Sequence, residues 1–509
     1  MKSQHFCKRM LVLFAAVISL TLSGTAAFAQ EVPFSLPEKG IKAENLRAGQ
    51  NAHAQQFDGH ELYQRAFEVL RDYHIALADE ATRKQWVAEW EHKHDGDTAL
   101  NTEAGTDKAI AEMVKSLNQR FDYFLDKKQV EQEDEQVNSS LVGVGMSVKL
   151  RDQESLIKQL PKNPTREQVR NALRVSKDHP LMVEEPMEGA PAEKAGLKAG
   201  DAITRVDGKS LNGLTLDEAV ARIRGKEGSQ VKITYERTDT SGKASTTTLT
   251  ITRARVVSHV VKFKDLGNGV SYVKLRNFES RNATAEMAAA LMQAAQGKAL
   301  IIDLRNNPGG SLSSVLTMAA MLVPEGTILV THDREGGSIR EHRLIMQQHY
   351  LVREAPDDKD PDKVQVKASD RPELIIPPEM PVVVLVNENS YSASEILSGV
   401  LQVRHRATIV GTATGGKGVG QSVINLPYGR RLHVTSFEFL PGGMKMDWIG
   451  IVPDVQVEQP KDVQDDKQLQ AAQDTVSQLI QKADELARKR QELRQKHEDD
   501  FNRSRDRLR

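Results

Sequence analysis

The chain has 509 residues, which is enough for two or three domains with an ample apolar core. Its 69 basic and 70 acidic side chains nearly cancel, so the charge balance does not favour nucleic acid or any strongly charged partner. One cysteine, Cys7, excludes a scaffold built on disulfides.

The first 29 residues have the three-part pattern of a secretory signal peptide. Basic residues come first, an apolar run follows over residues 10–22, and Ala27-Phe28-Ala29 supplies a small-x-small cleavage site. An uncleaved membrane anchor is the alternative, but polar residues interrupt the apolar run and favour cleavage. Cleavage would remove Cys7, and we therefore expect an exported protein of the periplasm or cell envelope.

Residues 30–57 predict a polar linker, and apolar residues at helical spacing predict a helical N-terminal cap over residues 58–135. Leu62, Ala66 and Leu70 are examples of this spacing. The predicted mature chain contains neither an H-x-x-x-H nor a C-x-x-C pattern, so no metal site is predicted.

A glycine-broken apolar stretch, LVGVGMSV at residues 141–148, opens a predicted domain over residues 136–255. Glycines let consecutive backbone N–H groups point one way and bind an anion. Further along, the sequence predicts a one-turn helix begun by Pro191 and ended by Gly196, a hairpin turn at Asp207-Gly208, an amphipathic helix over 216–223 and a strand over 231–236.

This order of elements resembles a PDZ domain. The resemblance implies that Gly143, Val144, Gly145 and Met146 form the loop that holds a peptide's terminal carboxylate, while the following strand pairs with the peptide. A PDZ fold that packs against the rest of the protein and binds nothing is the alternative. A charged insertion near residues 151–179 departs from the usual pattern.

Strands and helices alternate over residues 256–459, which predicts an α/β core around a mainly parallel sheet. Strands are predicted over 270–275, 299–304, 382–386, 407–410, 419–426 and 430–439, the last continuing the same sheet, and helices over 283–296, 312–322 and 393–403. The segment DLRNNPGG, residues 303–310, follows a buried strand at the edge where sites gather in such sheets. The polar residues 340–372 predict an exposed insertion or flap.

Residues 381–421 place a serine-rich turn between a buried strand and a helix, and then a lysine in a glycine-rich loop. A helix N-terminus offers unpaired N–H groups to an oxyanion, and a neutral lysine can act as the base that a serine needs. Ser390, Ser392 and Ser394 are equally suited to capping and turn roles. A phosphate-binding loop ending at Lys417 is disfavoured, because Gly418 and a predicted strand follow it.

Three ordered motifs together resemble the carboxyl-terminal processing, or tail-specific, proteases. They are the PDZ glycine loop, the segment DLRNNPGG, and SYSASEI followed by GKG. The resemblance implies that Ser392 is the nucleophile, Lys417 the general base and Gln421 the residue that orients the lysine.

The same resemblance implies an oxyanion hole made by the Ala393 N–H and by the N–H of either Gly309 or Gly310. It also implies that Asp303 and Arg305 hold their loop by a salt bridge. A looser match aligns residues 116–125, SLNQRFDYFL, with the family pattern S-L-x-D-x-x-S-x-Y-L.

Four positions depart from the family pattern. Tyr391 stands where a small residue is usual, Thr412 and Gly415 replace a usual acid and aromatic, and Val403 stands where an acidic residue is common. The dyad is intact, but these departures leave open whether any carboxylate network supports it.

The resulting prediction is a multidomain α/β (α+β) protein with an inserted PDZ domain and a charged helical tail over residues 460–509. The resemblance implies an exported serine endopeptidase that cleaves near unstructured, apolar C-terminal tails through an acyl-enzyme, without a cofactor. A non-catalytic PDZ scaffold on a degenerate protease body is the alternative. The expected partners are protein C-termini, with a delivering adaptor left open, and the tail helix either docks on its own protein or mediates self-association.

Overall fold

The computed structural model describes residues 57–137, 140–161, 166–187, 189–239, 241–257, 259–335, 338–357, 363–460 and 465–507. They form two compact units, one made by the chain before residue 132 together with the chain after residue 258, and the other made by Gln132–Ser258. The predicted signal peptide and almost all of the predicted linker lie outside the described residues. Within the described ranges, no helix has the length and apolar character needed to cross a membrane.

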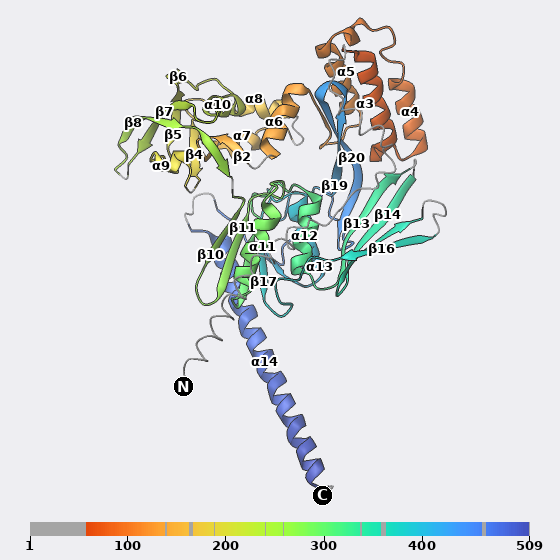
Figure 1. Ribbon diagram of the computed structural model, residues 1–509, viewed down its shortest axis with the longest axis vertical. Coiled ribbons are helices and arrows are strands. Elements are labelled where there is room, and N and C mark those ends of the chain that lie inside the picture. The colour runs from red at the N-terminus through yellow and green to blue at the C-terminus, as the bar shows by residue number, and fades with distance from the viewer. Residues whose placement is uncertain are drawn as a thin grey trace, which may run out of the picture. The chain divides into compact units, whose positions relative to one another are not determined.

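The first unit begins with the helical cap (Figure 1). Its helices are α3 (Gly59–Tyr73), α4 (Glu80–Trp90) and α5 (Glu103–Ser116), with short 3-10 turns at Ile75–Leu77 and Thr98–Asn101 and the strand β1 (Tyr123–Leu125). The next helix, α6 (Lys127–Val137), runs across the boundary between the two units. Asp58 and Asp79 cap the first two helices by accepting N–H groups of their first turns. The apolar faces of the cap pack against Ile424, Leu426 and Leu432 of the neighbouring sheet.

A six-stranded sheet forms the centre of the first unit. Its order is β10 (Val261–Asp265), β11 (Val270–Leu275), β12 (Ala299–Asp303), β17 (Val382–Val386), β18 (Thr408–Gly411) and β21 (Val455–Gln456), and only the β10–β11 pair is antiparallel. Successive residues of the buried strands face opposite sides of the sheet. One face packs on α11 (Ala283–Ala294), α12 (Leu312–Leu322) and α13 (Ala393–Val403), and the other packs on α14 (Lys467–Arg507). The predicted mainly parallel sheet is confirmed.

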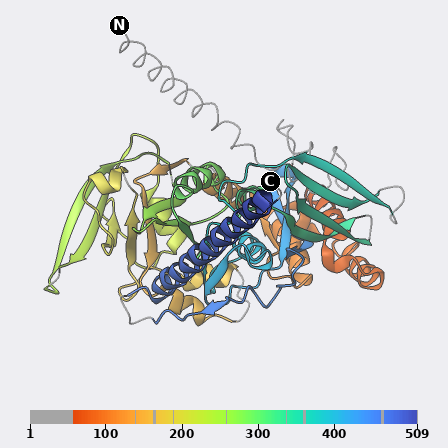
Figure 2. The same ribbon diagram turned by 90° about the horizontal axis from the view of Figure 1, so that it is seen from below.

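The long helix α14 is docked only through its first turns. Ala472 and Val476 are fully buried against β12, β17 and β18. Leu486 and Leu493, further along, are 47% and 58% exposed. Figure 1 shows the helix leaving the sheet and continuing outward, and in Figure 2, seen from below, the same helix is drawn in front of the sheet.

A second, antiparallel sheet of the first unit corrects one prediction. Its order is β1, β20 (Arg430–Pro441), β13 (Gly326–Glu335), β14 (Ser338–Met346), β15 (Tyr350–Pro356) and β16 (Val364–Asp370), with β19 (Val419–Leu426) paired to β20. The prediction that residues 430–439 continue the parallel sheet is wrong. The turn Pro427–Gly429 between β19 and β20 is too short for the crossover that parallel strands require, so the two strands form a hairpin.

The polar insertion at residues 340–372 belongs to this second sheet. It forms the successive antiparallel strands β14, β15 and β16, and nearly all of the last strand is exposed. The described residues of this segment therefore extend the sheet.

The second unit is built on the sheet β3 (Met146–Leu150), β4 (Leu181–Pro186), β5 (Ala202–Val206), β7 (Gln230–Thr238) and β8 (Ala244–Thr252), with β6 (Lys209–Ser210) on β5 and a separate pair of β2 (Ser140–Gly143) with β9 (Ala254–Val257). Its helices are α7 (Gln153–Lys158), α8 (Arg166–Ala172), α9 (Pro191–Lys194) and α10 (Leu216–Ile223). Thr215 and Glu218 form a capping box at the start of α10. The charged insertion contributes α7 and α8, and β3 is an edge strand of the sheet.

Candidate active site

Ser392 occupies the strand-to-helix turn between β17 and α13. Its backbone has φ +54° and ψ −112°, a conformation that L-residues rarely adopt and that is common at functional turns. Ser390 and Ser394 are fully buried, and their hydroxyls donate to the carbonyls of Leu304 and Asn307, both at 2.9 Å. Ser392 is the partly exposed member of the three serines, which singles it out as the accessible hydroxyl.

Glu395, in the first turn of α13, accepts hydrogen bonds from both the serine turn and the lysine loop. One of its carboxylate oxygens accepts the Ser392 N–H at 2.7 Å and the Lys417 N–H at 2.9 Å. The other accepts the Thr414 hydroxyl at 2.6 Å and the Gly416 N–H at 2.7 Å. Burial raises the pKa of this carboxyl, and the four hydrogen bonds oppose that shift. The motifs alone gave no role to this residue, although it lies within the SASEI segment.

Lys417 lies on the glycine-rich loop between β18 and β19. Its Nζ donates to the Gln421 side-chain oxygen at 2.8 Å and lies 4.5 Å from the centre of the Phe121 ring. Burial lowers the pKa of Lys417 to about 8; Glu395 and Asp122 oppose the shift, and Arg120 adds to it. The lysine is thereby brought within reach of its neutral form near physiological pH.

The serine and the lysine are neighbours held through Glu395. In the described part of the chain, no hydrogen bond joins the Ser392 hydroxyl to Lys417 Nζ. Catalytic hydrogen bonds are often long in an enzyme without substrate and shorten in the complex. The shared carboxylate oxygen holds the two backbones close to one another.

The DLRNNPGG loop lies against the serine turn, and its two glycines differ in burial and in hydrogen bonding. The Gly309 N–H is buried and donates to the Asn307 side chain at 2.9 Å. Gly310 is exposed, and its N–H has no hydrogen-bond partner among the described residues. A Cβ at Gly309 would lie 2.9 Å from Ser392 Cβ and 3.0 Å from the Ala393 nitrogen, so the loop touches the Ser392 turn directly. Of the two predicted glycine donors, Gly310 is the one left available for an oxyanion.

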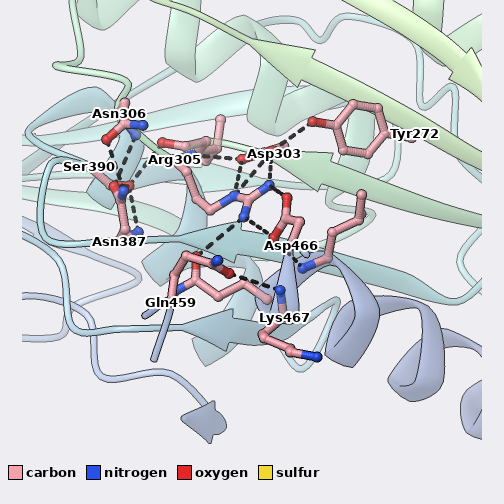
Figure 3. A network of polar contacts seen from close by, with 12 residues as sticks. Tyr272, Asp303, Arg305, Asn306, Asn387, Ser390, Gln459, Asp466 and Lys467 are labelled. Carbon is pink, nitrogen blue, oxygen red and sulfur yellow. Dashed lines mark hydrogen bonds and ion pairs between the residues drawn. The ribbon is translucent and has the colours of Figure 1, made fainter. Parts of the chain in front are cut away.

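A polar network anchors the start of this loop to the tail helix (Figure 3). Arg305 binds Asp303 at 2.7 Å and Asp466 at 2.7 Å, and Asp303 also accepts the Tyr272 hydroxyl at 2.7 Å. Burial opposes the charge of Arg305, but the two carboxylates hold its pKa above the usual value. The expected salt bridge between Asp303 and Arg305 is therefore present.

Two departures from the family pattern have a steric explanation. A Cβ on Gly415 would come within 1.8 Å of the Tyr391 ring, so the glycine makes room for the tyrosine. Val403 ends α13, about 16 Å along the helix from Ser392 at 1.5 Å per residue, and packs on Gly442. A side chain at position 403 is therefore remote from the dyad.

The predicted carboxylate loop lines a pocket in the second unit. Gly143, Val144, Gly145 and Met146 contribute to it, together with Val220, Ile223 and Arg224 of α10 and its C-terminal end. Gly145 has φ +73°, and a Cβ there would lie 2.4 Å from Ala190, so only glycine fits. The lining is mostly apolar, with Arg224 as its one charged residue. Among the described residues, no group of three or more metal-binding side chains occurs.

Comparison with known proteins agrees with this architecture. The family model described as Peptidase family S41 matches residues 269–457, and a model described as PDZ domain matches residues 182–237. A carboxyl-terminal-processing protease of Synechocystis sp. is 33% identical over 366 residues, which cover 71% of this chain and 73% of the relative. A probable CtpA-like serine protease of Staphylococcus aureus (strain MRSA252) is 29% identical over 364 residues, which cover 71% of this chain.

The chain spans 62% of the length of that S. aureus relative. Among solved structures, a photosystem II D1 C-terminal processing protease is 25% identical, with a TM-score of 0.46, over 79% of this chain and 94% of that one. The two family models together define a class of PDZ-containing peptidases. This chain belongs to peptidase family S41, among the carboxyl-terminal-processing proteases, which confirms the family inferred from its motifs.

Proposed function

We propose that the protein is an exported serine endopeptidase that cleaves proteins near unstructured, apolar C-terminal tails. The observation that carries the proposal is the pair of hydrogen bonds from the Ser392 and Lys417 amides to one oxygen of Glu395. It keeps an accessible hydroxyl and a lysine of lowered pKa on adjacent loops at the carboxyl ends of parallel strands.

In the proposed reaction, the Ser392 hydroxyl attacks the scissile carbonyl and its proton passes to neutral Lys417. One N–H of the amine continues to donate to Gln421, which leaves the lone pair for the serine proton. The ammonium then protonates the leaving amine, and the acyl-enzyme remains. Water attacks the ester with Lys417 again acting as the base, and the released serine regains its proton.

The negative oxygen that forms during both attacks requires donors. The Gly310 N–H, on an exposed loop beside the nucleophile, and the Ala393 N–H, at the start of α13, are the two we assign. The N-terminal end of the helix dipole favours the same charge.

Substrate selection is assigned to the PDZ unit. The apolar pocket beside the edge strand β3 suits an extended peptide whose last side chain is apolar, with its carboxylate at the glycine loop. The leader-like first 29 residues favour export to the periplasm or cell envelope.

The test is incubation of the purified protein with an unfolded test protein that ends in an apolar tail, without ATP or added metal. Cleavage by the wild type and none by Ser392→Ala supports the proposal. Labelling of Ser392 by a fluorophosphonate probe gives a second, substrate-independent readout. Binding of the tail with neither cleavage nor labelling would instead identify a non-catalytic PDZ scaffold.

A further inference from the structure

A chain of hydrogen bonds leads from the proposed base into the helical cap. Lys417 Nζ donates to Gln421 Oε1 at 2.8 Å, and Gln421 Nε2 donates to Thr435 Oγ1 at 3.3 Å. The Thr435 hydroxyl donates to Asp122 Oδ1 at 2.6 Å. The links come from β19, β20 and the loop before β1, so three separate segments of the chain meet behind the lysine.

The direction of this chain is determined at its buried end. An ionised carboxylate can only accept, so the single hydroxyl proton of Thr435 points at Asp122. The threonine oxygen must then accept from its other neighbour, which is the amide nitrogen of Gln421. The Gln421 side chain is therefore fixed with its oxygen toward Lys417, and the alternative flip would direct N–H groups at the amine.

His74 holds the Asp122 carboxylate in place by a hydrogen bond. The histidine Nδ1 accepts the Ala76 N–H at 3.1 Å, so its proton is on Nε2, which donates to Asp122 Oδ2 at 2.5 Å. The Thr435 N–H adds a third donor to the carboxylate at 2.6 Å. The side chains of His74 and Asp122 are 0% and 1% exposed, so no water competes for these positions.

We propose that Asp122, held by His74, is a positioning residue of the protease: through Thr435 it fixes the amide of Gln421 and thereby the orientation of the Lys417 amine toward Ser392. The inference rests on the proposed function. Residues 116–125 match the family pattern S-L-x-D-x-x-S-x-Y-L only in part. At position 122 this chain has an acid where that pattern has a serine.

The charged groups that act on Lys417 are Glu395 on α13 and Asp122 and Arg120 before β1. Asp447 accepts the N–H of the next residue, Gly418, at 2.8 Å. The carboxylates of Glu395 and Asp122 favour the ammonium form, and Arg120 opposes it. Loss of the Asp122 charge should therefore shift the pH–rate profile toward lower pH, whereas loss of the Thr435 hydroxyl alone should not.

The experiment compares Thr435→Val, Thr435→Ser, Asp122→Asn and the control Ser436→Ala on the tail-bearing test protein. Ser436 is a matched control because it pairs with Ser422 across the same two strands, at 2.7 Å, one residue away. We expect Thr435→Val and Asp122→Asn to lower kcat about tenfold or more with KM unchanged. Thr435→Ser and Ser436→Ala should retain the wild-type kcat. Among the four variants, only Asp122→Asn should shift the rise of activity with pH to lower pH.

Wild-type kcat and pH profile in both Thr435→Val and Asp122→Asn would overturn the proposal. Equal losses in Thr435→Val and Thr435→Ser would also overturn it, because packing rather than the hydroxyl would then be responsible; this comparison holds even where Thr435→Val folds poorly. A wild-type protein that neither cleaves nor reacts with the fluorophosphonate probe would reject the proposed function itself, which is a distinct result.

Discussion

Arg305 and Asp466 are joined by two hydrogen bonds, of 2.7 and 2.8 Å, although 161 positions separate them in the chain (Figure 3). Arg305 starts the loop that carries Gly309 and Gly310, and Asp466 immediately precedes the tail helix α14. The bidentate pair therefore connects the docking of the tail to the loop assigned to the oxyanion.

Removing Arg305 should lower the free energy of unfolding more than removing Asp466. Arg305→Ala leaves Asp303, whose side chain is fully buried, without its cation, and we expect a loss of about 3–5 kcal/mol in the free energy of unfolding. Asp466→Ala leaves Arg305 bound to Asp303 and should cost less, with a modest fall in kcat. Urea unfolding and kcat measure both effects, and Glu485→Ala, in an exposed pair with Lys489 on the same helix, is a control expected to change neither.

The three neighbouring serines should separate stability from activity. Ser390→Ala and Ser394→Ala each remove a buried hydroxyl that satisfies a carbonyl, so we expect each to lower the free energy of unfolding by about 1–3 kcal/mol. Ser392→Ala should abolish cleavage with unchanged thermal unfolding. If Ser392→Ala still cleaves while Ser390→Ala or Ser394→Ala is inactive, Ser392 is not the nucleophile.

The sequence predicted the centre of the site because its determinants are local. The strand over residues 382–386, the helix over 393–403 and the lysine loop lie in one continuous stretch, where hydrophobic runs and turn residues are readable. The sequence could not show that β20 belongs to the antiparallel sheet, because the composition of a strand does not specify which strand it pairs with.

Other parts of the site depend on tertiary packing. Asp122 and Thr435 meet although 313 positions separate them, and nothing in either local sequence indicates that contact. The choice between Gly309 and Gly310 depends on where the Asn307 side chain points, which no motif encodes. Glu395 lies in the SYSASEI motif three residues after Ser392, a spacing at which a glutamate can accept the N–H of the helix N-cap residue.

Tyr391 and Gly415 should be energetically coupled. Gly415→Ala places a methyl group within 1.8 Å of the Tyr391 ring and should destabilise the protein, because the ring has to move to admit it. In the Tyr391→Ala background the same substitution should be tolerated. A double-mutant cycle in urea should give a coupling of about 0.5–3 kcal/mol; additive effects of the two substitutions would refute the steric explanation.

The state of the substrate's C-terminus should affect the rate through the second unit. A free carboxylate after an apolar residue suits the glycine loop and the apolar pocket, so amidation or charged final residues should lower kcat/KM. Gly145→Ala should abolish this preference, because its Cβ would collide with Ala190. Equal rates for free and amidated tails would remove the proposed carboxylate role from the loop.

The lowered pKa of Lys417 should be visible in stability as well as in rate. Its folded pKa of about 8 lies below the ordinary value of 10.5, so the protonated amine destabilises the fold. This penalty is fully present below pH 8 and disappears as the pH rises through 10.5. Lys417→Met should therefore be inactive yet more stable than the wild type at pH 7, with the difference vanishing above about pH 10.5. Urea unfolding at several pH values measures it.

The same ionisation predicts the pH dependence of cleavage. Because the base must be neutral, kcat/KM should rise with pH and level off above about 8. Gln421→Glu replaces a neutral acceptor of the Lys417 proton by an anion, which favours the ammonium form, so the limb should move to higher pH and the rate at pH 7 should fall. Lys417→Arg keeps the charge but cannot accept a proton, and it should be nearly inactive. If Lys417→Arg retains most of the activity, the lysine is a structural cation and another group must accept the serine proton.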